Sequence, residues 1–171
     1  MNWFPLALDG FAVSAAADAD APGLQALFES DAAYALLVEG RLPGPNAGKE
    51  AITDRPENFA PEELAKLILR DGDGRIAAFV DLLRHYPREG IIWLGLIFVA
   101  PHARGGMGKK LMQALHATAA RCGFDAMQLG VVEGNRAQQL YERLGYRHIR
   151  TARRAGEDGQ VRTVFVMERS L

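Results

Sequence analysis

The feature that most constrains the fold is a segment in which a buried strand, a glycine-rich bend and an amphipathic helix follow one another directly. The run IIWLGLIFVA, residues 91–100, is apolar but too short to cross a membrane, so it predicts a buried strand. Three glycines follow at positions 105, 106 and 108, and an apolar stripe with helical spacing then runs from Leu111 to Cys122. The segment therefore predicts an α/β fold in which the chain bends sharply from strand to helix.

The bend is suited to bind an anion. A glycine-rich backbone at a helix N-terminus leaves N–H groups uncovered, and the helix dipole adds positive potential there. Arg104 and Lys109 place two positive charges beside these amides. The order of residues excludes a P-loop, because Ala103 and Lys110 stand where glycine and serine or threonine are needed, and a dinucleotide-binding fingerprint that starts at Gly106 fails as well. A tight turn without a ligand remains the alternative.

The other segments predict further strands and helices. Strands are expected over 11–16, 64–70, 75–85, 125–132, 146–153 and 161–168, and helices over about 20–28, 32–38 and 136–144. The stretch from 40 to about 60 shows weak periodicity and is expected to be a loop on the substrate side or a mobile flap. A length of 171 residues fits one core, so we expect a single domain over 1–171.

The charge of the chain excludes some classes of partner. A formal charge of -1 gives no overall attraction to nucleic acid or to an acidic membrane surface. The distribution is uneven, since residues 1–40 carry six acids and no base, whereas residues 101–124 carry four bases and no acid. With one cysteine, four scattered histidines and no signal-peptide pattern, the sequence predicts a cytoplasmic protein without a metal site.

Two stretches resemble the GCN5-related N-acetyltransferase (GNAT) superfamily of acyl-CoA-dependent enzymes. The sequence LGLIFVAPHARGGMGKKLM, residues 94–112, is similar to the family's strand and pyrophosphate loop, and LGVVEGNRAQQLYERLGY, residues 129–146, is similar to its later strand and helix. In order of elements the resemblance covers roughly residues 64–168. It implies a mixed, mostly antiparallel sheet of six to seven strands, flanked by helices and splayed between the fourth and fifth strands.

The resemblance also implies an activity. The expected enzyme transfers an acetyl group from acetyl-CoA to an amine of a small molecule or peptide, by direct attack in a ternary complex, and a homodimer is compatible with it. The alternatives are a catalytically silent acyl-CoA-binding or regulatory module and a transferase that uses a different acyl-CoA. Tyr141 matches the family tyrosine that gives a proton to the departing thiolate. The expected coenzyme-binding residues are Phe98, Val99, Arg104, Gly105, Gly106, Met107, Gly108, Lys109, Asn135 and Tyr141.

Two spacings depart from the family pattern. With the glycines aligned, Ala103 occupies the slot that is usually arginine or glutamine, and Arg104 follows one place late. Asn135 lies six residues before Tyr141, where the family more often shows seven. The family roles of the glycines and of the tyrosine are therefore transferred to this chain with better support than the contacts of Arg104 and Asn135.

The general base is absent from its usual place. Many family members carry a glutamate on the fourth strand, but residues 91–100 contain no carboxylate. Asp81, His85, Glu133 or a chain of water molecules are the alternatives.

On the acceptor side, the helix over 32–38 is flanked by Asp31 and Glu39, with Tyr34 between them. This charge favours a cationic amine as the acceptor, and ordinary solvated surface is the alternative explanation.

Overall fold

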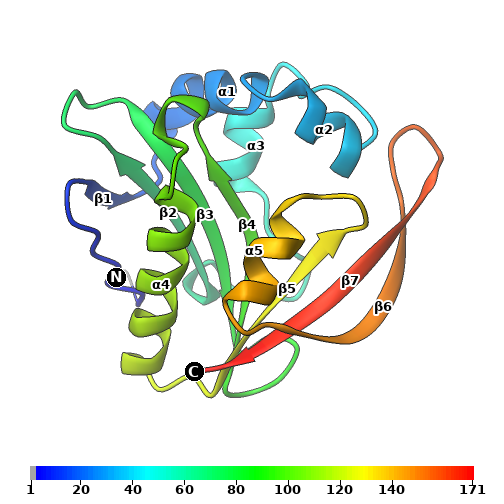
Figure 1. The fold of residues 1–171 in the computed structure, drawn as a ribbon. Coiled ribbons are helices and arrows are strands. Elements are labelled where there is room, and N and C mark those ends of the chain that lie inside the picture. Colours follow the sequence, from blue (N-terminus) through cyan, green and yellow to red (C-terminus); the bar gives the residue numbers. More distant parts are fainter. Residues whose placement is uncertain (1–2) are drawn as a thin grey trace.

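A computed structural model describes residues 3–171, and within them seven strands form one sheet in the order β1-β2-β3-β4-β5-β7-β6 (Figure 1). Neighbouring strands are antiparallel except β4 and β5, which are parallel. This confirms the predicted fold class. The strands are β1 Ala12–Ala15, β2 Leu64–Arg70, β3 Ile76–Arg84, β4 Ile91–Val99, β5 Ala126–Val132, β6 Arg147–Ala155 and β7 Val161–Ser170.

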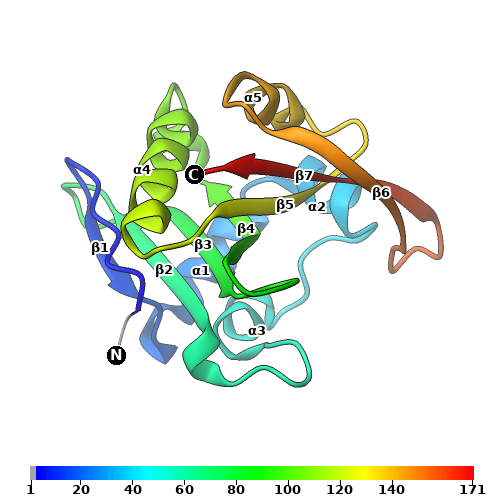
Figure 2. The same cartoon turned by 90° about the horizontal axis from the view of Figure 1, so that it is seen from below.

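Helices cover both faces of this sheet. Figure 2 shows α4 and α5 on one side and α1, α2 and α3 on the other. The helices are α1 Ala21–Glu29, α2 Ala32–Val38, α3 Ala47–Thr53, α4 Met107–Arg121 and α5 Ala137–Arg143, with short 3-10 turns at Asp18–Asp20, Pro61–Glu63 and Pro101–Ala103. Within residues 3–171, no helix has the length and apolar character needed to cross a membrane.

Each face has its own apolar core. The predicted stripe of α4 is buried, and Leu111, Met112 and Leu115 are completely shielded against the sheet. Burying one such side chain stabilises the fold by about 1.5–3 kcal/mol. On the opposite face, Leu24 and Phe28 of α1 pack with aromatic and aliphatic residues of β2, β3 and β4. The two cores fix β4 between the layers, and β4 leads directly into the glycine bend.

The segment from 40 to 60 is not the loop that weak periodicity predicts, because it contains α3. A helix of this length is marginal by itself. The side chain of Gln25 in α1 accepts from the Gly48 N–H at 2.9 Å and donates to the carbonyl of Gly44 at 2.8 Å. A Cβ at Gly48 would lie 2.2 Å from the carbonyl oxygen of Ala21, so the helices meet closely. Tertiary contacts with α1 therefore stabilise α3.

The parallel strands β4 and β5 pair only over their first half. Pairing runs from Ile91 with Ala126 to Leu94 with Leu129 and then ends. At the same point the register between β3 and β4 shifts, since Asp81 opposes Leu96 while Leu82 opposes Leu94, which leaves Gly95 as the extra residue of a bulge. The predicted splay between β4 and β5 is present, and it coincides with the bulge at Gly95.

Candidate active site

The parting of β4 and β5 opens into a cavity of about 650 Å³, bordered by these strands and by α2, α4 and α5. This volume is in the range of small-molecule sites. Of the predicted coenzyme-binding residues, Phe98, Val99, Arg104, Gly108, Asn135 and Tyr141 line the cavity. The others, Gly105, Gly106, Met107 and Lys109, lie beside it in the loop and first turn of α4.

One edge of β4 presents free amides to this cavity. The Ala100 N–H donates to the carbonyl of Ala77 on β3 at 2.8 Å. Because N–H groups alternate along a strand, the Phe98 N–H also faces β3, whereas those of Ile97 and Val99 face the gap. The ring of Phe98 packs against Phe28, with centroids 5.5 Å apart. On this part of β4 the N–H groups that are open to a ligand are therefore those of Ile97 and Val99, while Phe98 borders the cavity without its N–H.

The glycine bend leaves open space at the start of α4. Gly105 and Gly106 both have φ of 106°, in a region that favours glycine, and no atom lies within 4 Å of a Cβ built at either position. Gly106 is the N-cap and supplies no side chain to the first amides of the helix. Met107 is buried in the core below the bend. Its side chain anchors the loop, and its backbone amide is the part that a ligand could reach.

Arg104 reaches across the cavity mouth to α2. Its guanidinium lies 2.5 Å from the carboxylate of Asp31, which caps α2 by accepting from the Tyr34 N–H at 3.0 Å. The Arg104 hydrogen bond and the Tyr34 amide lower the pKa of Asp31. Arg104, which was expected to bind the coenzyme phosphates, is thus paired with Asp31, which was expected to face the acceptor. The pair neutralises the charge of Asp31.

Tyr141 lies on the α5 wall of the cavity and is 7% exposed. Burial raises the pKa of its phenol, and nearby Tyr34 raises it further. Tyr34 lines the cavity from α2, and burial raises its pKa to about 12. Both phenols are protonated at neutral pH and can donate hydrogen bonds into the cavity. In the sequence Tyr34 stands only between two acids, and no local pattern shows that it lines the same cavity as Tyr141.

Asn135 lies just before α5, the helix that carries Tyr141. Its side-chain oxygen accepts from the Ala137 N–H at 2.9 Å, so it fixes the first turn of α5. The residue still lines the cavity, and its side-chain amide nitrogen remains available as a donor.

A family model described as "Acetyltransferase (GNAT) family" matches residues 31–146, which include the bulge, the glycine bend and α5. The chain belongs to the GNAT acetyltransferase family. Comparison with curated proteins gives no significant match. A GCN5-related N-acetyltransferase from Kribbella flavida is 26% identical, with a TM-score of 0.69 over 95% of this chain and 99% of that chain.

Two more distant structures share the GNAT fold. An acetyltransferase from Thermus thermophilus is 20% identical, with a TM-score of 0.74 over 94% of this chain and 97% of that chain. The acetyltransferase yncA from Salmonella typhimurium, in a structure with its cofactor acetyl-CoA, is 19% identical, with a TM-score of 0.64 over 95% of each chain.

None of the three side chains predicted as bases in this GNAT chain lines the cavity. Asp81 pairs with Lys66 at 3.0 Å, and burial raises its pKa. It lies behind the bulge, 3.9 Å from the position of a Cβ at Gly95. His85 pairs with Glu89 at 3.1 Å, and Glu133 is exposed after β5. Among residues 3–171, no group of three or more His, Cys, Asp or Glu side chains could hold a metal ion.

Three connected polar side chains, Tyr146, His116 and Arg169, extend from the ring of Tyr141. The Tyr141 ring contacts Tyr146, with centroids 5.7 Å apart, and the Tyr146 hydroxyl lies 2.8 Å from Nε2 of His116. Arg169 donates to Nδ1 of His116. Since arginine can only donate, Nδ1 is the acceptor, Nε2 carries the proton, and the Tyr146 oxygen accepts it. Burial and Arg169 lower the pKa of His116 to about 4, so it stays neutral.

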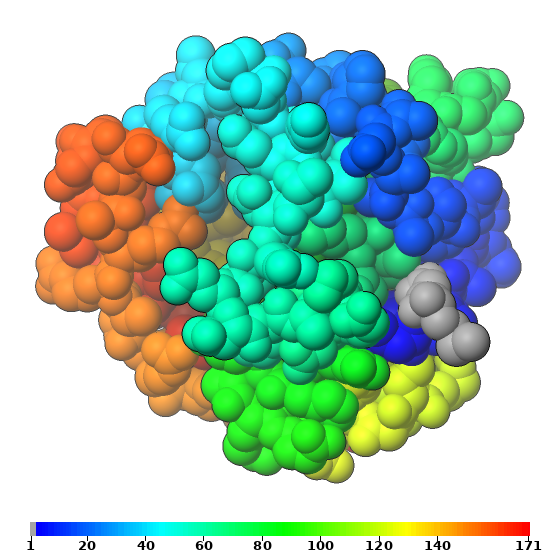
Figure 3. Space-filling view, turned by 180° about the vertical axis from the view of Figure 1, so that it is seen from behind, coloured from blue at the N-terminus to red at the C-terminus, as the bar shows by residue number. Residues whose placement is uncertain are grey.

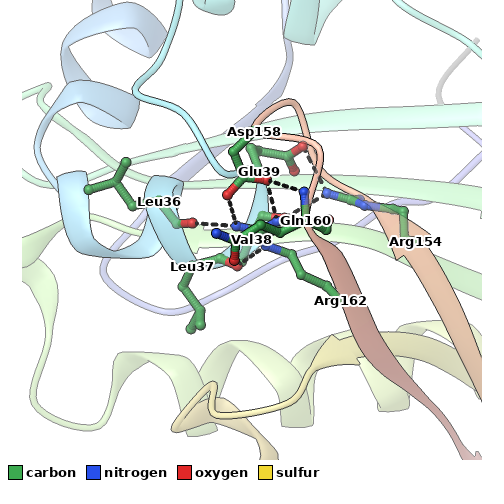
Figure 4. Close-up of polar contacts among 8 residues, drawn as sticks. All are labelled: Leu36, Leu37, Val38, Glu39, Arg154, Asp158, Gln160 and Arg162. Atoms are coloured by element: carbon green, nitrogen blue, oxygen red, sulfur yellow. Dashed lines mark hydrogen bonds and ion pairs between the residues drawn. The ribbon is translucent and has the colours of Figure 1, made fainter.

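The β6–β7 hairpin holds the C-terminal end of α2 (Figure 4). Arg162 donates from Nε to the carbonyl of Leu37 at 2.7 Å and from a terminal nitrogen to that of Leu36 at 3.1 Å. Asp158 orients this guanidinium through bonds of 2.8 and 2.9 Å. The last carbonyls of a helix lack their full set of partners within the helix, so the Arg162 bonds stabilise this end of α2, where the Leu36 carbonyl also accepts from the Gly40 N–H at 3.2 Å.

A second arginine of the hairpin adds to this contact. Arg154 donates to the carbonyl of Val38 and to the carboxylate of Glu39, both at 2.8 Å. Leu37, in the same turn of α2, lines the cavity. The hairpin therefore fixes one wall of the cavity and neutralises Glu39, the second acid that was expected on the acceptor side.

Proposed function

We propose that this GNAT protein is an acetyl-CoA-dependent N-acetyltransferase in which an amine attacks the thioester directly in a ternary complex. The observation that carries the proposal is the parting of β4 and β5, which places free amides of β4 on one side of a cavity and the Tyr141 phenol on the other. These are the two kinds of group that acyl transfer to an amine needs, namely donors for a developing oxyanion and a donor for the leaving thiolate.

Separate parts of the site fit separate parts of the coenzyme. The first amides of α4 and the open space over Gly105 and Gly106 suit the pyrophosphate, because the helix dipole and free N–H groups attract anions. Arg104 can add charge there when it leaves Asp31. The N–H groups of Ile97 and Val99 suit the thioester carbonyl.

The proposed step balances with the groups present. The amine nitrogen forms a bond to the carbonyl carbon and the bond from that carbon to sulfur breaks. The sulfur receives a proton from the Tyr141 phenol, the amine loses one to water, and water returns a proton to the Tyr141 phenolate, so the step releases no net proton. A raised pKa keeps Tyr141 protonated until sulfur charge develops. Water is the proton acceptor because, among the described residues that line the cavity, Asp31 is the only carboxylate and it is paired with Arg104.

Ligand binding tests the first half of the proposal. Calorimetry should show that CoA and acetyl-CoA bind and that both raise the melting temperature of the protein. Absence of binding at millimolar concentration would contradict the proposal.

Turnover tests the second half. With any amine that the protein acetylates, Tyr141→Phe should lower kcat about a hundredfold or more while CoA affinity stays within about twofold, because only the acid is removed. Tyr86→Phe, on a tyrosine outside the cavity, is the matched control. If CoA binds but no amine is acetylated, the silent acyl-CoA-binding module replaces the enzyme. If another acyl-CoA is turned over faster, the donor is corrected and the mechanism is kept.

A further inference from the structure

A second cavity lies beside the active site, and the proposed acetyl transfer gives it no role. Its volume is about 250 Å³, and its walls include Phe28 of α1, Leu42 in the segment between α2 and α3, Ala51 of α3 and Phe98 of β4. In Figure 3 the cyan segment that follows α2 borders a hollow in this face of the molecule, on the side of the orange hairpin. An acceptor can approach the second cavity from this side.

The second cavity adjoins the active site at β4. Tyr34, Leu96 and Phe98 line both cavities. Leu96 and Phe98 stand on either side of Ile97, whose N–H is a proposed donor to the thioester carbonyl. Because alternate side chains of a strand lie on one face, the side chains of Leu96 and Phe98 share the face of the second cavity. A group held against them is therefore separated from the thioester by the length of only a few bonds.

The lining of the second cavity has no net charge. Its charged residues are Glu39, Arg41 and Glu50. Glu39 is bound by Arg154 at 2.8 Å, whereas Arg41 and Glu50 have opposite charges and lie at exposed positions. The charges of these four residues cancel, and the other lining residues are uncharged. The cavity therefore suits an uncharged group better than an ammonium or a carboxylate.

Aromatic rings form the inner wall of the second cavity. The ring of Phe98 meets those of Phe28 and Tyr34 edge to face, with centroids 5.5 and 5.3 Å apart. Leu42 on the outer wall is 56% exposed, so a bound group would cover apolar surface that now faces solvent. An apolar cavity of about 150 Å³ is large enough for benzene. A volume of about 250 Å³ therefore fits one six-membered ring.

We propose that the second cavity binds the apolar part of the acceptor, and that the acceptor is a primary amine joined by a short chain to one uncharged ring. This inference rests on the proposed acetyl transfer and names its substrate class. Asp31 and Glu39 favour a cationic acceptor in the sequence, but both are paired with arginines and their charges are neutralised. A ring held in the second cavity keeps the amine beside the thioester, which favours direct attack.

Four amines that share the reacting group test the substrate class. They are 2-phenylethylamine, ethylamine, cadaverine with its cationic tail and 4-aminobutyrate with its anionic tail. We expect kcat/KM for 2-phenylethylamine to exceed each of the others by at least tenfold, because even one methylene group in an apolar pocket changes kcat/KM by about 10–200-fold. Calorimetry should also show that 2-phenylethylamine binds the complex with CoA, in which no acetyl group can be transferred.

A variant that fills the second cavity tests the site. Ala51→Leu adds carbon atoms to its α3 wall, so kcat/KM for 2-phenylethylamine should fall about tenfold while that for ethylamine stays within about twofold. Ala117→Leu, at an exposed position of α4, is the matched control because it makes the same change outside both cavities.

A second variant removes part of the outer wall. Leu42→Ala should lower kcat/KM for 2-phenylethylamine about threefold, and the fold should be unaffected because Leu42 is largely exposed. Leu36→Ala is the matched control, since Leu36 is 50% exposed and lies outside both cavities.

Several results would overturn the inference while leaving acetyl transfer intact. These are equal kcat/KM for the four amines, a preference for cadaverine or 4-aminobutyrate, acetylation only of amines that lack an apolar ring, or equal losses in Ala51→Leu and Ala117→Leu. A preference for 2-phenylethylamine that persists unchanged in Ala51→Leu and Leu42→Ala would overturn the assignment of the ring to this cavity. If the protein binds acetyl-CoA but acetylates no amine, the proposed function fails together with this inference.

Discussion

The two ends of α2 are held in different ways. At its N-terminal end a single ion pair joins Asp31 to Arg104, whose side chain is 52% exposed. At its C-terminal end Arg162, only 13% exposed, donates to two helix carbonyls and is oriented by Asp158. An exposed ion pair is weak and its arginine can bind another anion instead, whereas Arg162 is largely shielded from solvent and is held by several hydrogen bonds at once. We infer that the Arg104–Asp31 contact can open so that Arg104 binds the coenzyme, whereas the Arg162 contacts fix the position of α2.

The position of α2 matters because the helix carries Tyr34 and Leu37 in the cavity wall. A seven-residue helix is marginal by itself, so its place depends on these tertiary contacts. Variants at the two ends, measured separately, show whether the contacts differ as described.

The largest effect is expected at the C-terminal end. Arg162→Ala removes the donors to both carbonyls, so α2 should shift and the KM for the acceptor should rise about tenfold or more, with a clear fall in melting temperature. Steady-state kinetics and thermal unfolding measure the two effects. Arg88→Ala is the control, because Arg88 is exposed and, within residues 3–171, its side chain bonds only the adjacent Glu89 carbonyl. An unchanged KM would show that the hairpin does not position α2.

The second prediction concerns the stability of the protein in acid. Variants at the two ends of α2 should be compared at a pH where this acid effect is absent. The pKa of His116 is lowered to about 4, so the unfolded chain takes up a proton below about pH 6.5 while the folded protein does not. The free energy of unfolding should therefore fall as pH drops from about 6.5 to about 4, by on the order of 2 kcal/mol through this group. Above pH 6.5 the group contributes no such dependence.

Urea unfolding at pH 7 and pH 4.5 measures this effect. His116→Gln should lose much of the decrease, whereas His148→Gln, at an exposed position of β6, should keep it. A variant at His116 with the same pH dependence as the parent would assign the acid sensitivity to other groups.

The smallest effect is expected at the N-terminal end. Asparagine caps a helix as well as aspartate does, so Asp31→Asn keeps the start of α2 and removes only the charge that binds Arg104. CoA affinity should rise about threefold at low salt, because Arg104 becomes free to bind phosphate, and the gain should shrink at high salt.

Calorimetry at two salt concentrations measures this change, with Asp9→Asn as an exposed control. Unchanged or weaker CoA binding would mean that Arg104, even when released from Asp31, does not bind the coenzyme, and the contacts at both ends of α2 would then be structural.

Local sequence was informative where the chemistry lies within a few consecutive residues. The strand from 91 to 99, the glycine bend and the stripe of α4 were predicted because an apolar run, a lack of side chains and a helical period are local properties. The helix α3 was missed because its stability comes from contacts with Gln25 and Ala21 of α1, which no local pattern contains.

The sequence by itself determined the GNAT fold class, the bend that opens α4 and the helix that carries Tyr141. Only the tertiary structure decided which partners these residues meet: that Arg104 pairs with Asp31, that Tyr34 lines the same cavity as Tyr141, and that the amide of Ile97 rather than that of Phe98 points into the gap. The physical reason is that propensity and periodicity act between near neighbours, whereas ion pairs and strand register join residues that folding brings together from distant positions.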